Sequence, residues 1–452
     1  MRILKKIFSP SFLIISFLIL FYTFYKSEII HDGSKKDYYF TYYIFSILLI
    51  ILSIFTFYLK EKIKDYLIIS VISIFIGLYL FEGYLNFLEY QQHQQIYKKQ
   101  KIYKKETGKD YDMRTIFEFY NYNLKKGKNI TVKVPSYSYV NKKTKIFPLS
   151  SISYMETINC NENGYFSVYQ SDRYGFNNPD EEWDKDEIEY LLIGDSSTHG
   201  ACVNRPNDMA SVLRTLSNKS VLNLGYGGNG PLIEYATLRE YLKPNVKNVL
   251  WIYFEGNDWS DLRFELNNPI LKKYINDPTF TQNLKLKQKQ INELAKKIIN
   301  TELEENEKKI YKFLTKEKIM ANLKLSKVRN VINQYLPEQR KPLYSGVNTK
   351  IELEKILKEA NDLVNQNNSS LYFVYLPSYY RYKSKNFKTN YLEVLQIVNN
   401  LNIPIVDLHK EVLEKSEDPL EFFPFKYFGH NNVKGYRKFT DTIFKIVSEQ
   451  SF

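Results

Sequence analysis

The chain has 452 residues with a formal net charge of +13, and 16% of its residues are aromatic. This length predicts two or three domains, and the low content of glycine (17) and proline (15) excludes collagen-like and low-complexity classes. Two cysteines exclude a disulfide-rich scaffold and a four-cysteine zinc site, and the five histidines form no H-E-x-x-H motif. Lysine is abundant, as are Ile, Asn and Tyr, which indicates an AT-rich coding bias. We therefore do not interpret the net positive charge as a sign of nucleic-acid binding.

Residues 1–88 contain three apolar runs, at about 7–25, 38–59 and 66–88. A hydrocarbon core of about 30 Å needs about 20 helical residues, so we predict three transmembrane helices. The first run also fits a cleavable signal peptide, but no small-x-small cleavage site follows it, and we favour an uncleaved helix. Glu82 interrupts the third run, and we interpret it as an interfacial residue rather than a functional acid inside the membrane.

Basic residues near the ends of these runs predict their orientation. The amino terminus and the loop between the second and third runs carry Arg2, Lys5, Lys6, Lys60, Lys62 and Lys64. The loop between the first and second runs offsets its lysines with acids, namely Lys26, Lys35 and Lys36 against Glu28, Asp32 and Asp37. We therefore expect a multi-pass protein of the inner (cytoplasmic) membrane, with everything after residue 88 extracytoplasmic.

The soluble part divides into two segments. Residues 89–187 predict a linker or helical stalk followed by a small accessory β-rich segment. Residues 188–449 hold short apolar runs of strand length, with helix-like stretches between them, at 188–193, 221–224, 249–254, 371–376 and 403–406. This alternation predicts an α/β domain whose parallel sheet is covered by helices on both faces. Residues 260–345 break the rhythm, and we interpret them as a helical insertion that projects as a lid or docking arm.

Polar residues follow several of these predicted strands, where functional groups gather in a doubly wound sheet. Ser196 follows the first strand, Gly228 the second, Asn257 the third, and His430 comes after the fifth. The backbone N–H groups of Ser196 and Gly228 and the amide of Asn257 could form an oxyanion hole. A histidine can take the serine proton and return it to the leaving group.

The motifs Gly194-Asp-Ser196, Asn223 to Gly228, Gly256-Asn-Asp258 and His430, in this order, resemble those of the SGNH (GDSL) hydrolase family. The resemblance covers residues 188–449 apart from the insertion. It implies a flavodoxin-like three-layer α/β/α fold, a nucleophilic Ser196 and a basic His430. It also implies an oxyanion hole of Ser196, Gly228 and Asn257; Gly225 and Gly227 match the motif less well than Gly228.

The family usually carries an aspartate two or three residues before the catalytic histidine, where this chain has Phe428 and Tyr427. The orienting acid is therefore absent, replaced by a backbone carbonyl, or supplied from elsewhere. Asp407 and Asp418 are accessory candidates without the motif spacing. We therefore predict a Ser–His dyad, with a less firmly held imidazole and a lower rate.

Each of these residues also has a structural interpretation. Ser196 and Asp195 are good helix caps, and we interpret Asp195 as a residue that organises the turn. Asn257 could be a turn residue and His430 a buried structural histidine, although we favour the chemical roles. His199, one helical turn after Ser196, either touches the site or is structural. The glycine-rich loop lacks the lysine and the spacing of a phosphate-binding loop, so we expect no cofactor and no metal.

The two cysteines, Cys160 and Cys202, are a candidate disulfide if the domain faces an oxidising compartment; otherwise they are two buried thiols. Such a bond would link the accessory segment to the helix of Ser196.

Taken together, the sequence predicts a membrane-anchored serine esterase that acts on an acylated envelope carbohydrate or another ester. One alternative is an O-acyltransferase for a cell-surface polysaccharide, which could need a membrane partner protein because three helices are few for moving acyl groups across a bilayer. The other is a catalytically weak binding or assembly module. The sequence does not distinguish them, and it does not define the acyl group, the acceptor or the oligomeric state.

Overall fold

A computed structural model describes residues 2–33, 36–142, 144–312, 316–335, 348–384 and 387–450. The chain forms two compact units: Met1–Gln92 with Thr315–Tyr335, and His93–Leu314 with Leu336–Phe452. Lys35 and residues 336–345 of the predicted insertion lie outside the described residues.

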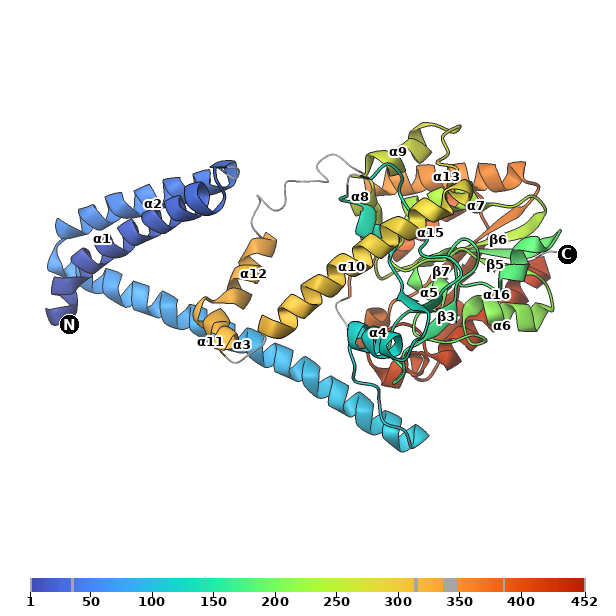
Figure 1. The fold of residues 1–452 in the computed structure, drawn as a ribbon, viewed down its shortest axis with the longest axis horizontal. Helices are drawn as coiled ribbons and strands as arrows, with labels where there is room; N and C mark the ends of the chain where they lie inside the picture. The colour runs from blue at the N-terminus through green and yellow to red at the C-terminus, as the bar shows by residue number, and fades with distance from the viewer. Residues whose placement is uncertain are drawn as a thin grey trace. The chain divides into compact units, whose positions relative to one another are not determined.

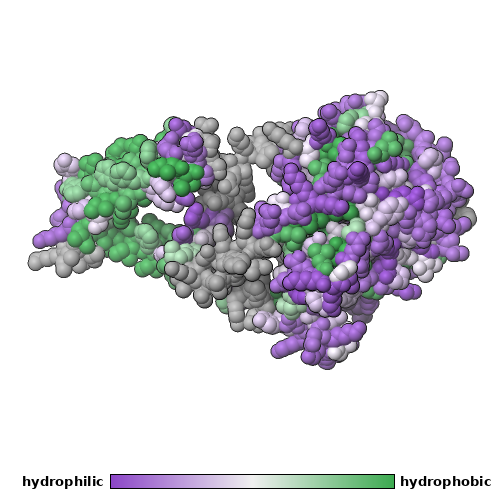
Figure 2. Space-filling model, in the orientation of Figure 1, coloured by the Kyte–Doolittle hydropathy of each residue, from purple (hydrophilic) through white to green (hydrophobic). Residues whose placement is uncertain are grey.

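The first unit contains α1 (Arg2–Phe24) with the π-helical turn Tyr25–Ile30, α2 (Lys36–Phe57), and the first part of α3 (Glu61–Thr107) (Figure 1). Segments of all three are long and apolar enough to cross a membrane, namely Lys5–Ile30, Tyr38–Phe57 and Glu61–Leu88. Their outer surface is hydrophobic (Figure 2), with Leu18 and Phe21 more than half exposed. Large apolar side chains left on a surface indicate contact with lipid or with another protein.

The end of the insertion belongs to this apolar unit. It forms α11 (Lys316–Leu323) and α12 (Ser326–Tyr335). Glu82 is buried, and its carboxylate accepts the backbone N–H groups of Lys327 (3.2 Å) and Val328 (2.8 Å). These N–H groups belong to the first turn of α12 and have no partner within the helix. Glu82 therefore caps a helix.

The second unit is built on a five-stranded, wholly parallel sheet in the order β5-β4-β6-β7-β8. This is the flavodoxin-like order, in which ligands bind where the strand order reverses, between β4 and β6. The strands are β4 (Ile188–Gly194), β5 (Val221–Asn223), β6 (Val246–Phe254), β7 (Ser370–Leu376) and β8 (Ile405–Asp407). The helices are α5 (Ser196–His199), α6 (Met209–Ser217), α7 (Pro231–Tyr241), α13 (Thr349–Gln366), α14 (Tyr379–Lys383), α15 (Tyr391–Asn400) and α16 (Val433–Gln450).

Both faces of the sheet are buried, which explains why its strands are nearly continuous apolar runs. Along β4, Leu191 and Ile193 join the core on one face, while Tyr190 and Leu192 join the core on the other. Helices α7, α13 and α15 contribute to the first core, and α6 and α16 to the second. The α/β three-layer prediction is confirmed.

The first half of the insertion is part of the core and not a projecting arm. It forms α8 (Asp258–Glu265), α9 (Pro269–Asn276) and α10 (Gln288–Lys312). Leu271, Ile291 and Ala295 are completely buried in the larger core. Their burial corrects the prediction that the whole of 260–345 projects from the domain.

The accessory segment forms α4 (Ile116–Lys125) and a small sheet in the order β1-β2-β3. In that sheet β1 (Ile130–Val132) runs parallel to β2 (Glu156–Ile158), and β3 (Val168–Gln170) runs antiparallel to β2. Short 3-10 or π-helical turns lie at Ser136–Tyr139, Asp180–Asp184, Leu284–Leu286, His409–Leu413, Pro419–Phe422 and Pro424–Lys426. The loop between β2 and β3 reaches the carboxyl edge of the large sheet, where the candidate site lies.

Candidate active site

The turn after β4 places a serine hydroxyl at the switch point of the large sheet. Ser196 is the first residue of α5, and Asp195 is its N-cap. The Asp195 carboxylate accepts the backbone N–H of Ser197 (2.8 Å) and the hydroxyl of Ser196 (3.2 Å). Burial raises the pKa of Asp195, although these hydrogen bonds oppose the shift. Asp195 thus organises the turn that presents Ser196.

His430 lies against this serine and is held by a second carboxylate. Its Nε2 is 2.8 Å from Ser196 Oγ, and its Nδ1 is 3.0 Å from Glu162 Oε1. The backbone N–H of His430 also donates to Glu162 Oε2, at 2.5 Å. Glu162 therefore fixes both the backbone and the ring of His430, and the three side chains form a hydrogen-bonded series of acid, imidazole and hydroxyl.

The opposite charges of Glu162 and His430, whose side chains are 25% and 29% exposed, stabilise each other. Burial alone would raise the pKa of Glu162, but the hydrogen bond and charge of His430 outweigh it and leave that pKa below its usual value. Burial would likewise lower the pKa of His430, but Glu162 outweighs it and leaves that pKa above its usual value. The arrangement favours an imidazolium on His430, the charged form that a general base reaches after taking a proton.

Glu162 corrects the prediction of an unsupported Ser–His dyad. The two candidate acids lie in other interactions: Asp407 accepts the hydroxyl of Tyr391 and the N–H of His409, and Asp418 pairs with Lys426. The acid comes instead from the accessory segment, from a loop that no motif spacing connects to His430.

A disulfide and the end of the stalk hold the Glu162 loop in place. Cys160 and Cys202 are joined in a disulfide, with their Cα atoms 4.9 Å apart. On the other side, the ring of Tyr103 in α3 packs where a side chain on Gly164 would stand. Because Cys202 follows α5, the bond links the loop of the acid to the segment of the nucleophile. The sulfur of Cys202 lies close to the side chains of Glu162 and His430. Because this sulfur is part of the disulfide, it is unavailable as a metal ligand.

Two of the predicted oxyanion residues, Gly228 and Asn257, line a cavity of about 330 Å³ together with Tyr137, Asp261, Phe264 and Glu265. Gly228 has a φ of +75°, and a Cβ on it would overlap the ring of Tyr137, so this position requires glycine. Asn257 Nδ2 donates one hydrogen bond to Asp261 (2.6 Å), which leaves its second N–H for a ligand. Of the other two glycines, Gly225 donates its N–H to Asn223 Oδ1 (2.9 Å).

Two acids in the cavity are shifted toward their neutral forms. Burial raises the pKa of Asp261 to about 6 and that of Glu265 to about 8. Glu265 accepts N–H groups at the start of α7, including those of Gly230 (2.5 Å) and Leu232 (2.9 Å). These contacts fix the end of the glycine-rich loop that carries Gly228.

Lys133, which directly follows β1, places an ammonium group beside the nucleophile. Its Nζ donates to Asn159 Oδ1 at 2.5 Å. The point where Gly227 would carry a Cβ lies 2.7 Å from Lys133 Nζ and 3.9 Å from Ser196 Cβ. Sequence reasoning missed this residue, because a lysine after a short strand carries no signal of its own in a lysine-rich chain.

The charge of Lys133 responds to its surroundings. Burial lowers the pKa of this lysine to about 8, although the nearby carboxylates of Asp195 and Glu162 oppose the shift. Below that pH the group is a cation near the place where a substrate carbonyl would meet Ser196.

His199 lies in the interior, beneath the glycine-rich loop. It is completely buried, with its ring between Tyr169 and Tyr226 and its Nδ1 3.1 Å from the carbonyl oxygen of Gly225. Burial, followed by the charge of Lys133, holds the pKa of His199 well below its usual value. It is a neutral support under the glycine-rich loop, a position that fits its structural interpretation.

No family model matches this chain, and no curated protein matches it. Among solved structures, a protein described as lipolytic and of the G-D-S-L family, from Desulfitobacterium hafniense DCB-2, is similar at 12% identity and a TM-score of 0.30. That match covers 57% of this chain and 99% of the other. The acetyl xylan esterase AlAXEase is similar at 13% identity and a TM-score of 0.32, over 57% of this chain and 100% of its own. Likenesses of this size do not define a function for this chain.

Proposed function

We propose that this chain is a membrane-anchored serine hydrolase of the SGNH type that cleaves an ester through an acyl-serine intermediate. The observation that carries the proposal is the series of hydrogen bonds from Ser196 Oγ through His430 to Glu162. A hydroxyl, a base that accepts its proton, and an acid that orients the base are the parts that nucleophilic acyl transfer requires. A complete triad favours turnover over the alternative of a binding module.

The chemistry follows from these positions. Ser196 Oγ attacks the ester carbonyl carbon while its proton passes to His430 Nε2, and Glu162 stabilises the resulting imidazolium. The carbonyl oxygen becomes an oxyanion, for which the N–H groups of Ser196, Gly228 and Asn257 are the donors. The C–O bond then breaks, and His430 returns the proton to the departing alcohol oxygen. Water, activated by the same base, cleaves the acyl-serine and restores the free hydroxyl.

The cavity indicates how the acyl and alcohol parts of the substrate are oriented in the site. Its small volume and its Tyr137 and Phe264 walls suit a short acyl group, with the alcohol part extending outward. The disulfide between Cys160 and Cys202 supports an extracytoplasmic domain, because such bonds persist in oxidising compartments. An acylated envelope carbohydrate meets both conditions. If a sugar hydroxyl replaces water in the second step, the same site is an O-acyltransferase.

The test uses the full chain purified in detergent, with p-nitrophenyl esters from acetyl to octanoyl. We expect activity that decreases with acyl length, and fluorophosphonate labelling of Ser196. Ser196→Ala should abolish both, whereas Ser217→Ala, on α6, should leave both intact. Unchanged hydrolysis by Ser196→Ala would overturn the proposal. An absence of labelling, with glycan binding preserved, would favour a binding module instead. Transfer of the acyl group to an added sugar would identify the transferase.

A further inference from the structure

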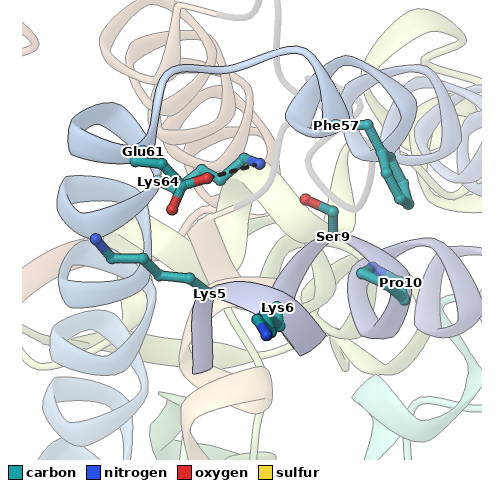
Figure 3. Close-up of a pocket in the computed structure, with 7 residues that line it drawn as sticks. All are labelled: Lys5, Lys6, Ser9, Pro10, Phe57, Glu61 and Lys64. Atoms are coloured by element: carbon teal, nitrogen blue, oxygen red, sulfur yellow. Dashed lines mark hydrogen bonds and ion pairs between the residues drawn. The ribbon is translucent and has the colours of Figure 1, made fainter. Parts of the chain in front are cut away.

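The apolar unit has a polar hollow of its own, at one end of its helices (Figure 3). The hollow measures about 700 Å³ and is lined by Lys5, Lys6, Ser9, Pro10, Phe57, Glu61 and Lys64. These residues come from the start of α1, the end of α2 and the start of α3, so the hollow lies beside three candidate membrane spans. Nothing in the proposed hydrolase chemistry uses it.

Hydrogen-bond donors outnumber acceptors in this hollow. Three lysines line it against one glutamate. Lys5 is paired with Asp65 at 2.6 Å, but Lys64, whose side chain is only 14% exposed, lies a long 3.5 Å from Glu61. The ammonium of Lys64 therefore keeps donors that a better acceptor could use.

Ser9 provides a second, independent observation. Buried hydroxyls elsewhere in α1 and α2 bond to a carbonyl of the preceding turn, as those of Ser16, Thr23, Ser46, Ser53 and Thr56 do. Ser9 is only 3% exposed, yet its Oγ has no partner among the described residues. In Figure 3 this oxygen points toward Lys64 and not back along its own helix. A buried hydroxyl without a partner at the wall of a hollow indicates a missing ligand.

The neighbouring proline explains why the hollow exists at this point. Pro10 lies within α1, where it has no N–H to give to the helix and its ring crowds the preceding turn. Pro10 and Phe57 also give the hollow an apolar side. Beyond them α1 continues with exposed apolar side chains such as Ile14. The site thus combines cationic and hydroxyl donors with a path along hydrophobic helix.

We propose that this hollow binds the phosphate group of an anionic membrane phospholipid, with the acyl chains lying along α1 and α2. A phosphodiester offers several acceptor oxygens and a negative charge, which match the free donors of Lys64, Lys6 and Ser9. Basic pockets between transmembrane helices bind anionic head groups in this way, on the side that positively charged loops mark as cytoplasmic.

The experiment measures lipid retention by the full chain with native mass spectrometry, after addition of equal amounts of phosphatidylglycerol and phosphatidylcholine. We expect the chain to retain phosphatidylglycerol preferentially. Ser9→Ala and Lys64→Gln should each weaken retention by roughly tenfold, the effect of losing one charge-assisted hydrogen bond. Lys62→Gln is the matched control, because it removes the same charge from the same first turn of α3 at an exposed position that does not line the hollow.

Equal retention by wild type, Ser9→Ala and Lys64→Gln would overturn the proposal, as would equal retention of the two lipids. In the last part of the experiment, millimolar inorganic phosphate is added as a competitor of the lipid. If it displaces the lipid completely, the phosphate contact stands but the assignment to a lipid is overturned. Because Ser9→Ala is a small change at a site without hydrogen bonds, it keeps the test decisive even if Lys64→Gln disturbs folding.

Discussion

Glu162 Oε1 lies 3.0 Å from Nδ1 of His430, although 268 residues separate the two along the chain. The acid belongs to the accessory segment, and the histidine to the last loop of the large α/β domain. A catalytic domain delimited at 188–449 would therefore lack one of its three central side chains.

Glu162→Gln should slow ester hydrolysis and change its pH dependence. We expect kcat to decrease by about 10²–10⁴, because the ring of His430 is no longer held or charge-stabilised. Hydrolysis needs the neutral imidazole, so the wild-type rate falls as the pH drops through the raised pKa of His430. Without the carboxylate, burial lowers that pKa, and the acidic limb of kcat/KM should move to lower pH.

The control for this variant is Glu421→Gln, since Glu421 pairs with Lys434 away from the imidazole. An acidic limb that stays in place in Glu162→Gln would show that Glu162 does not set the pKa of His430.

Lys133→Met should reduce kcat by roughly ten- to a hundredfold, the usual effect of losing one electrostatic contact to a developing oxyanion. Wild type should lose activity above about pH 8, where Lys133 gives up its proton. This decrease on the alkaline limb of the pH–rate profile should be weaker in Lys133→Met. Lys128→Met, at an exposed position of the same segment, should behave as wild type. A persistent alkaline limb in Lys133→Met would assign the limb to another group.

Cys160→Ser should lower both thermal stability and kcat. Closing a loop over a sequence separation of 42 residues contributes roughly 4 kcal/mol in the chain-entropy account, and the same bond positions Glu162. Cys202→Ser and the double variant should show the same losses, because each removes the same single bond. Thermal melts and kinetics of the three variants check this, beside wild type treated with reductant. Additive losses in the double variant would contradict it.

Asn257→Ala should reduce kcat by about 10²–10³ with little change in KM, as expected for a donor that acts in the transition state. Asn267→Ala is the comparison, because the Asn267 side chain, within the described part of the chain, bonds to the backbone of α8. A selective rise in KM for Asn257→Ala would indicate that the amide binds the ground state of the substrate instead.

Local sequence patterns were sufficient to predict the parallel sheet of this protein. The five strands lie where their apolar runs predict, because strands buried on both faces need apolar residues at every position. The turn of Ser196 and the loops of Gly228 and Asn257 follow from the ends of those strands. The position of His430 depends on a long final loop, and only the family resemblance pointed to it.

Glu162 escaped prediction because its partner is distant in sequence and its neighbours form no motif. One signal was present. The segment Asn159-Cys-Asn-Glu162 holds one of only two cysteines, and the other lies six residues after Ser196. A disulfide between them would have brought a carboxylate to the site. The two halves of the insertion belong to different units, and the sequence did not predict this for a similar reason. A helical pattern does not indicate which core each helix joins.

If the chain has the proposed hydrolase activity, the covalent bond between Cys160 and Cys202 also affects when that activity appears. A newly synthesised chain with both thiols reduced holds its serine and imidazole, but the loop of the acid lacks its covalent link to the segment of the nucleophile. Under the proposed topology, oxidation follows translocation, so full reactivity would arise only beyond the bilayer. Esters inside the cell would then be protected from hydrolysis while the chain is being synthesised.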